Sequence, residues 1–144
     1  MSQTGMPGRN ERNGELKDDL HRFYHDVFDF HVDVARRLVI VKFGARLTAD
    51  EITGYVTALR SHPAFQSIFS EIIDLRETEE LDLQANDFLR LADKVDPFAP
   101  QAKRAFVVRT RVQNHAARMH RILRGQGNIA IFESLEEAEA WIRS

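Results

Sequence analysis

Residues 71–83 read EIIDLRETEELDL and place three structural signals in one short segment. The segment from Ile68 to Leu75 is rich in large apolar residues, which is typical of a buried strand. The acids that follow it predict an exposed loop, and Asp82 is a suitable N-cap for the next segment, in which apolar residues recur at helical spacing. That helix must end before Asp96-Pro97, because the residue that precedes a proline disfavours the helical conformation. The segment therefore predicts a strand, an acidic loop and a helix in succession.

Two further strands are expected on the N-terminal side of this segment. Apolar and polar residues alternate from Phe28 to Val34, as in a strand buried on one face, whereas Leu38–Phe43 is almost continuously apolar, as in a strand covered on both faces. Because only a few residues separate them, the two strands are expected to form an antiparallel hairpin. A capping box at Thr48 and Glu51 then opens a helix that ends before His62-Pro63.

The C-terminal side continues the alternation of strands and helices. Residues 105–108 and 128–132 predict the fourth and fifth strands, and the helix between them ends at Gly125. The expected core stripe of that helix is Val112, Ala116, Met119 and Leu123. A second capping box, at Ser134 and Glu137, opens the final helix. The order β-β-α-β-α-β-α-β-α predicts a single α/β domain with a five-stranded mixed, mostly parallel sheet packed with helices.

A chain of 144 residues has the length of one ordinary domain and can bury an adequate core without a disulfide or a metal. Residues 1–15 are polar and rich in glycine, so we expect a disordered N-terminal tail. Residues 16–144 are expected to form the domain, which begins with a short helix at residues 16–24. His21 and His25 could share a face there, but no third ligand accompanies them, and we expect no metal and no cofactor.

The composition restricts the class of function. The chain has no cysteine, which excludes disulfides, thiolate zinc sites and cysteine nucleophiles. No apolar run approaches the roughly 18 residues of a membrane span, and the first ten residues lack the apolar core of a signal peptide, so we expect a cytoplasmic protein. A net charge of -2 at pH 7 gives no reason to expect nucleic-acid binding. Motifs of hydrolases, phosphate-binding loops and dinucleotide sites are absent from the sequence, so we expect no enzymatic activity.

Charge is unevenly distributed in the second half of the chain. Residues 71–96 carry nine acids and three bases, whereas residues 101–128 carry seven bases and no acid. The candidate acidic binding loop consists of Asp74, Glu77, Thr78, Glu79, Glu80 and Asp82. The candidate basic face of the following helix, opposite its apolar stripe, consists of Arg111, His115, Arg118 and Arg121, together with Asn114. A solvated helix surface accounts for this face more simply than a binding site does.

The order of these elements resembles the STAS-like domains, the fold of bacterial anti-sigma-factor antagonists and of sulfate-transporter C-terminal domains. More narrowly, the chain is similar to small bacterial STAS-like proteins of unknown function. The segments that carry the resemblance are 33–41 (DVARRLVIV), 44–51 (GARLTADE), 62–65 (HPAF), 73–75 (IDL) and 132–142 (FESLEEAEAWI). They are spread over roughly residues 24–143.

The resemblance implies the scaffold of an antagonist without its regulation. In antagonists of this fold, an Asp-Ser-Ser segment begins eight residues beyond an aspartate that ends a strand, and a kinase phosphorylates one of its serines. Here Asp74 and Asp82 have that spacing, but Leu83 and Gln84 stand where the serines would be. The neighbouring carboxylates would also repel a phosphate. Because Thr78 is a poor alternative acceptor, we expect the phosphoswitch to be absent.

Three functions are compatible with these patterns. The leading hypothesis is a non-catalytic interaction or regulatory module that contacts an unknown protein partner through the acidic loop. The alternative is a small-molecule or lipid-binding protein, since parallel α/β sheets bind ligands at the carboxyl ends of their strands, and an apolar pocket of several hundred cubic ångströms would support it. Self-association through the oppositely charged segments is the third, and it should weaken with salt.

Overall fold

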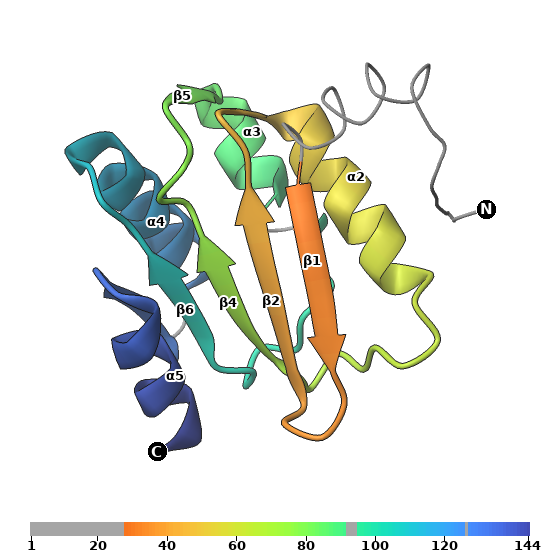
Figure 1. Cartoon of the computed structure of the whole chain (residues 1–144). Coiled ribbons are helices and arrows are strands. Elements are labelled where there is room, and N and C mark those ends of the chain that lie inside the picture. The colour runs from red at the N-terminus through yellow and green to blue at the C-terminus, as the bar shows by residue number, and fades with distance from the viewer. Residues whose placement is uncertain (1–27, 92–94, 126) are drawn as a thin grey trace, which may run out of the picture.

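The computed structural model describes residues 28–91, 95–125 and 127–144. Its main sheet consists of β1 (Phe28–Asp33), β2 (Leu38–Phe43), β4 (Ser70–Asp74), β6 (Arg104–Val107) and β7 (Ile129–Phe132), in that spatial order (Figure 1). Strands β2, β4, β6 and β7 are parallel, and β1 pairs antiparallel with β2. The predicted α/β class with a five-stranded, mostly parallel sheet is therefore confirmed. The expected tail, the short helix at residues 16–24 and the pair His21 and His25 lie outside the described residues.

In the described part of the chain, four helices pack on this sheet, namely α2 (Ala49–Arg60), α3 (Ala85–Arg90), α4 (Arg111–Arg124) and α5 (Leu135–Arg143). Helices α2, α3 and α4 connect parallel strands that follow one another in one direction across the sheet. Right-handed crossovers therefore place all three on the same face, and α5, which follows the last strand, covers part of the opposite face (Figure 1). None of the helices in the described part of the chain is long and apolar enough to cross a membrane.

The two faces of the sheet have separate cores. Alternate residues of β2 point in opposite directions, so Val39 and Val41 pack under α2 and α4, whereas Leu38 packs with Ala138 of α5. This is the arrangement expected for a strand covered on both faces. The larger core lies between the sheet and helices α2 and α4, and the buried, charged Glu71 and Arg104 point into it.

A second, two-stranded parallel sheet was not predicted. It pairs β3 (Arg46–Thr48) with β5 (Glu80–Asp82), so the expected acidic loop contains a strand. Asp82 is the last residue of β5 and does not cap α3, whose N-cap is Gln84. The prediction of Asp82 as N-cap was wrong because Asp82 binds Arg46 across the small sheet, with Nη2 to Oδ2 at 2.6 Å.

The buried stripe of α4 is displaced from the predicted one. Val112 is 61% exposed, whereas Gln113 and Ala117 are fully buried. The prediction was wrong because the buried residue at the start of α4 is an amide, which a search for apolar periodicity passes over. The predicted C-terminal cap is confirmed, since Gly125 adopts a left-handed conformation with φ of 65°.

The helix starts at Thr48 and Ser134 agree with the sequence. The Thr48 hydroxyl accepts the N–H of Glu51, and the Glu51 carboxylate accepts the N–H of Thr48, which completes the predicted capping box of α2. The Ser134 hydroxyl accepts the N–H of Glu137 and caps α5, but the described contacts show no return bond from the Glu137 side chain, so only half of the predicted capping box forms. Both starts could be predicted because a cap depends only on residues within one helical turn.

Candidate functional site

Most members of the candidate acidic loop are bound within the protein. Asp74 is buried, and its carboxylate accepts hydrogen bonds from the Arg76 backbone N–H at 3.0 Å and from Arg76 Nη2 at 2.9 Å. Burial alone would raise the pKa of Asp74, but the hydrogen bonds from Arg76 outweigh it and lower that pKa below its usual range. Asp74 therefore shapes the end of β4 and is not displayed to a partner.

The other loop residues divide between paired and exposed positions. Glu77 pairs with Lys42 at 3.1 Å, while Arg46 pairs with Glu80 and Asp82. Glu79 is exposed.

Thr78 is enclosed by the fold. It is only 2% exposed, its N–H donates to the Leu75 carbonyl, and its own carbonyl accepts from Gln113 Nε2 at 2.6 Å. A hydroxyl that is enclosed in this way is not open to a kinase. The loop is thus a closed structural element, and Glu79 is its most available acid.

The candidate basic face lies beside a surface hollow of about 580 Å³ at the carboxyl ends of β6 and β7. We call it the α4 groove. Its basic lining residues are Arg109, Arg111, His115 and Arg118. Thr110 and Asn114 add neutral polar groups, and Glu133 adds one acid. Arg121, the fourth residue of the predicted basic face, lies farther along α4 and does not line the groove.

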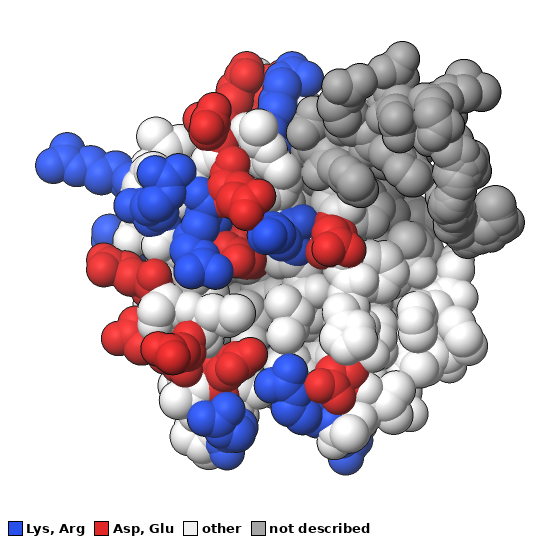
Figure 2. Space-filling model, in the orientation of Figure 1, with Lys and Arg blue, Asp and Glu red and all other residues white. Residues whose placement is uncertain are grey.

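The cations of the α4 groove are largely available to solvent. Arg111, His115 and Arg118 are exposed and form no ion pair within the described residues. Arg109 Nε donates to the Arg76 carbonyl at 3.0 Å, which fixes that side chain at the edge of the groove. Figure 2 shows Lys and Arg side chains gathered at the upper left, over the carboxyl ends of the strands and beside several acids.

Gln113 organises the backbone that forms the floor of the α4 groove. Its Oε1 accepts the N–H groups of Arg109 at 2.6 Å and Thr110 at 3.1 Å, and its Nε2 donates to the carbonyl of Thr78. The Thr110 hydroxyl in turn accepts the N–H of Gln113. One buried amide therefore ties the start of α4 to the end of β6 and to the loop after β4.

Beneath α2 and α4, the larger core contains a network of charged side chains. Arg104 Nε donates to Glu71 Oε1 at 2.8 Å, and Arg104 Nη1 donates to Asp96 Oδ2 at 2.7 Å. Tyr55 donates its hydroxyl to the other Glu71 oxygen at 2.6 Å. Arg124 Nε lies 3.2 Å from Asp96 Oδ2, so two guanidinium groups face two carboxylates. We call these five residues the buried network.

The contacts within the buried network shift the pKa values of Asp96 and Tyr55 in opposite directions. Burial would raise the pKa of Asp96, but the adjoining His120 imidazole and the Arg104 guanidinium outweigh burial and hold that pKa well below its usual range. Burial also raises the pKa of the Tyr55 hydroxyl, and the neighbouring Glu71 carboxylate raises it further. By formal charge, the network pairs two carboxylates with two guanidinium groups, and the Tyr55 phenol completes it.

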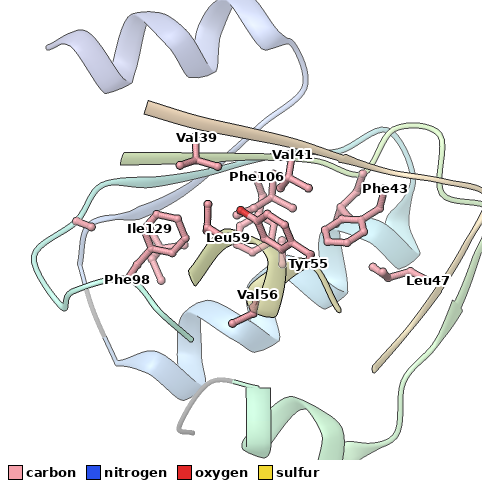
Figure 3. Close-up of a cluster of buried hydrophobic side chains, with 14 of the residues drawn as sticks. Val39, Val41, Phe43, Leu47, Tyr55, Val56, Leu59, Phe98, Phe106 and Ile129 are labelled. Atoms are coloured by element: carbon pink, nitrogen blue, oxygen red, sulfur yellow. The ribbon is translucent and has the colours of Figure 1, made fainter. Parts of the chain in front are cut away.

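A cavity of about 100 Å³, partly open to the surface, lies between the buried network and α3. Most of its lining is apolar, and its walls come from helices α2, α3 and α4, the sheet and the small β3–β5 sheet. Figure 3 shows Tyr55 and Val56 of α2 and Phe106 of β6 in this core, with Phe43 and Leu47 at one end. The cavity is smaller than the several hundred cubic ångströms named above for a lipid pocket.

Sequence reasoning missed the buried network and the cavity. Glu71 and Arg104 are register partners on β4 and β6, and the sequence contains one signal of this. Glu71 is a charged residue inside the predicted strand 68–75, and Arg104 immediately precedes the predicted strand 105–108. Asp96, Arg124 and Tyr55 come from three other segments, and their convergence depends on the tertiary structure.

No cluster of three or more metal-ligating side chains occurs among the residues that the structure describes. Comparison of the chain with protein-family models, with curated proteins and with solved structures found no match. The function must therefore be inferred from the geometry of the α4 groove and of the core.

Proposed function

We propose that this protein is a non-catalytic, STAS-like interaction module that binds an acidic segment of a partner protein in the α4 groove. The observation that supports it is the coincidence of a surface hollow with exposed Arg111, His115 and Arg118, which have no ion pairs within the described residues. Arginine suits this role because its planar guanidinium can bind a carboxylate through two hydrogen bonds. The backbone beneath these side chains is held by Gln113, so the groove is preorganised.

The binding surface that we propose is the α4 groove and not the acidic loop. Glu77, Glu80 and Asp82 already pair with Lys42 and Arg46, so a partner would have to compete with internal ion pairs at the loop. The same pairs weaken the case for self-association, since the loop of a second copy has few acids left to offer. A nucleic acid is disfavoured because binding of single strands uses aromatic stacking platforms, and the groove offers only His115.

The test measures binding of a fluorescein-labelled decaglutamate peptide by fluorescence anisotropy at low and moderate salt. We expect saturable binding by the wild type, and at least a tenfold loss in the double variant Arg111→Glu, Arg118→Glu. The matched control is Arg90→Glu, Arg143→Glu, which changes the net charge equally at exposed helix positions outside the groove. Equal losses in the two double variants would show that only the overall charge matters, and the proposal would fail.

A second arm compares the peptide with a single-stranded oligonucleotide of ten nucleotides. Under the proposal, the peptide binds at least as tightly as the oligonucleotide and competes with it for the groove. Tighter binding of the oligonucleotide, abolished by the same double variant, would reassign the groove to nucleic acid. Both affinities should fall as salt rises, because exposed charges are screened.

A further inference from the structure

We infer that the core cavity is a binding site for a small, uncharged, mainly apolar molecule of about the size of one aromatic ring. This site is separate from the α4 groove, because the two share no lining residue. The inference rests on the size of the cavity, its apolar lining, the neutrality of the buried network and the packing of α3.

The size of the cavity excludes a packing defect of one or two atoms. Protein interiors are close-packed, and voids larger than a water molecule are few. A cavity of about 100 Å³ approaches the engineered apolar cavity of roughly 150 Å³ that binds benzene in another protein. The space is adequate for a single ring with a small substituent, and it is too small for a lipid chain in its present form.

The chemistry of the walls selects an uncharged ligand. Apolar side chains form most of the surface, including Ile73, Val56 and Phe88. The carboxylates and the guanidinium at the base are matched, since Glu71 accepts from Arg104 and Tyr55, and the Arg104 guanidinium also binds Asp96. His120 also lines the cavity, and its Nε2 lies 3.5 Å from Asp96 Oδ2 without a hydrogen bond. A charged ligand would lose its hydration without finding a free counter-ion.

Helix α3 forms one wall of the cavity and is packed only weakly against the rest of the protein. It is six residues long, none of its residues is buried, and Leu89 is 54% exposed. Phe88 of α3 and Leu91, immediately after it, nevertheless line the cavity. Elements with few buried apolar contacts open at low free energy, so a ligand can reach the cavity past α3 without disrupting the sheet.

The experiment titrates the full-length protein with toluene, benzoate and benzylamine and follows methyl resonances by NMR. These three probes share one ring and differ in charge. We expect saturable shifts of the Ile73 and Val56 methyl groups with toluene, at millimolar concentration or below, and at least tenfold weaker binding of benzoate and benzylamine. Absence of saturable shifts up to the solubility limit of toluene would overturn the inference, as would equal or tighter binding of either charged probe.

Cavity-filling variants locate the binding. Ala116→Leu should reduce toluene affinity at least tenfold, because Ala116 lines the cavity from α4. Val56→Ile adds one methyl group from the opposite helix, should weaken binding a few-fold, and serves if Ala116→Leu does not fold. Val112→Leu, at an exposed position of the same helix, is the control and should bind as the wild type does. Wild-type affinity in both filled variants would place the toluene elsewhere and overturn the inference.

Binding in the core cavity should be independent of binding in the α4 groove. The variant Arg111→Glu, Arg118→Glu should lose the acidic peptide and keep its affinity for toluene, while Ala116→Leu should show the reverse. If the two ligands respond to the same variants, the cavity is not a separate site.

Discussion

At the level of single residues, the hydrogen bond from the Tyr55 hydroxyl to Glu71 tests the buried network most directly. The hydroxyl donates this 2.6 Å hydrogen bond to the Glu71 carboxylate, which is buried in an otherwise apolar surrounding. Tyr55→Phe removes this donor and keeps the ring, so we expect a loss of about 2 kcal/mol in the free energy of unfolding. Urea denaturation at pH 7 measures it.

Two other substitutions give stability losses with which the loss in Tyr55→Phe can be compared. Glu71→Gln takes one of two carboxylates from Arg104 and should cost about 3 kcal/mol, since breaking a buried ion pair exposes the remaining charge to an apolar environment. Thr53→Val removes a buried hydroxyl that has no hydrogen-bond partner in the described residues, and it should change stability by less than about 0.5 kcal/mol. A Tyr55→Phe variant as stable as Thr53→Val would contradict the role given to the Tyr55–Glu71 bond.

At the level of elements, the start of α4 depends on Gln113. Gln113→Leu would leave the N–H groups of Arg109 and Thr110 and the carbonyl of Thr78 without their partner. Because unpaired buried polar groups each cost about 1–3 kcal/mol, we expect a loss of at least about 2 kcal/mol in urea denaturation. Asn114→Ala, one residue further and facing the groove, should cost less than about 1 kcal/mol. Similar losses in the two variants would show that Gln113 does not anchor the helix.

The same helix shows which parts of the fold a sequence can predict. The hairpin of β1 and β2 and the caps at Thr48 and Gly125 were predicted correctly because each depends on neighbouring residues. The stripe of α4 was assigned to Val112 because hydrophobic periodicity recognises apolar side chains only, and Gln113 is a buried amide. The β3–β5 sheet was missed because strands of three residues carry almost no periodic signal, and their pairing joins segments far apart in the chain.

At the level of the whole molecule, the opposite charges of the two segments are partly neutralised inside the protein. Arg104 and Arg124 of the basic segment bind Glu71 and Asp96 of the acidic segment. The separation along the chain was visible in the sequence, but which charges face inward could not be known without the topology. The charges left on the surface differ between the two segments. The loop acids pair with Lys42 and Arg46, whereas the α4 groove keeps cations that have no ion pair among the described residues.

This internal neutralisation makes stability depend on acid pH. The pKa of Asp96 in the folded protein lies well below its usual value, and that of Asp74 is also lowered. As pH falls below about 4, the unfolded chain binds protons at these positions while the folded protein does not, so protonation favours unfolding. We expect the stabilising contribution of these carboxylates to be complete above about pH 5. The free energy of unfolding should then fall towards pH 3, by up to about 1.4 kcal/mol per pH unit for each such carboxyl.

The contribution of Asp96 can be isolated by comparing how steeply the free energy of unfolding changes with pH in each variant, instead of comparing its value at one pH. Asp96→Asn lowers stability at pH 7 because Arg104 loses a buried partner, yet between pH 5 and pH 3 its stability should fall less steeply than that of the wild type. Leu91→Ala is the matched control, since it removes a buried apolar side chain and keeps both carboxylates, so its curve should be lower than that of the wild type and parallel to it. Urea denaturation at pH 5, 4 and 3 gives the three slopes. If Asp96→Asn runs parallel to the wild type as well, the acid sensitivity arises outside the buried network, and the network acts through packing and not through its charge.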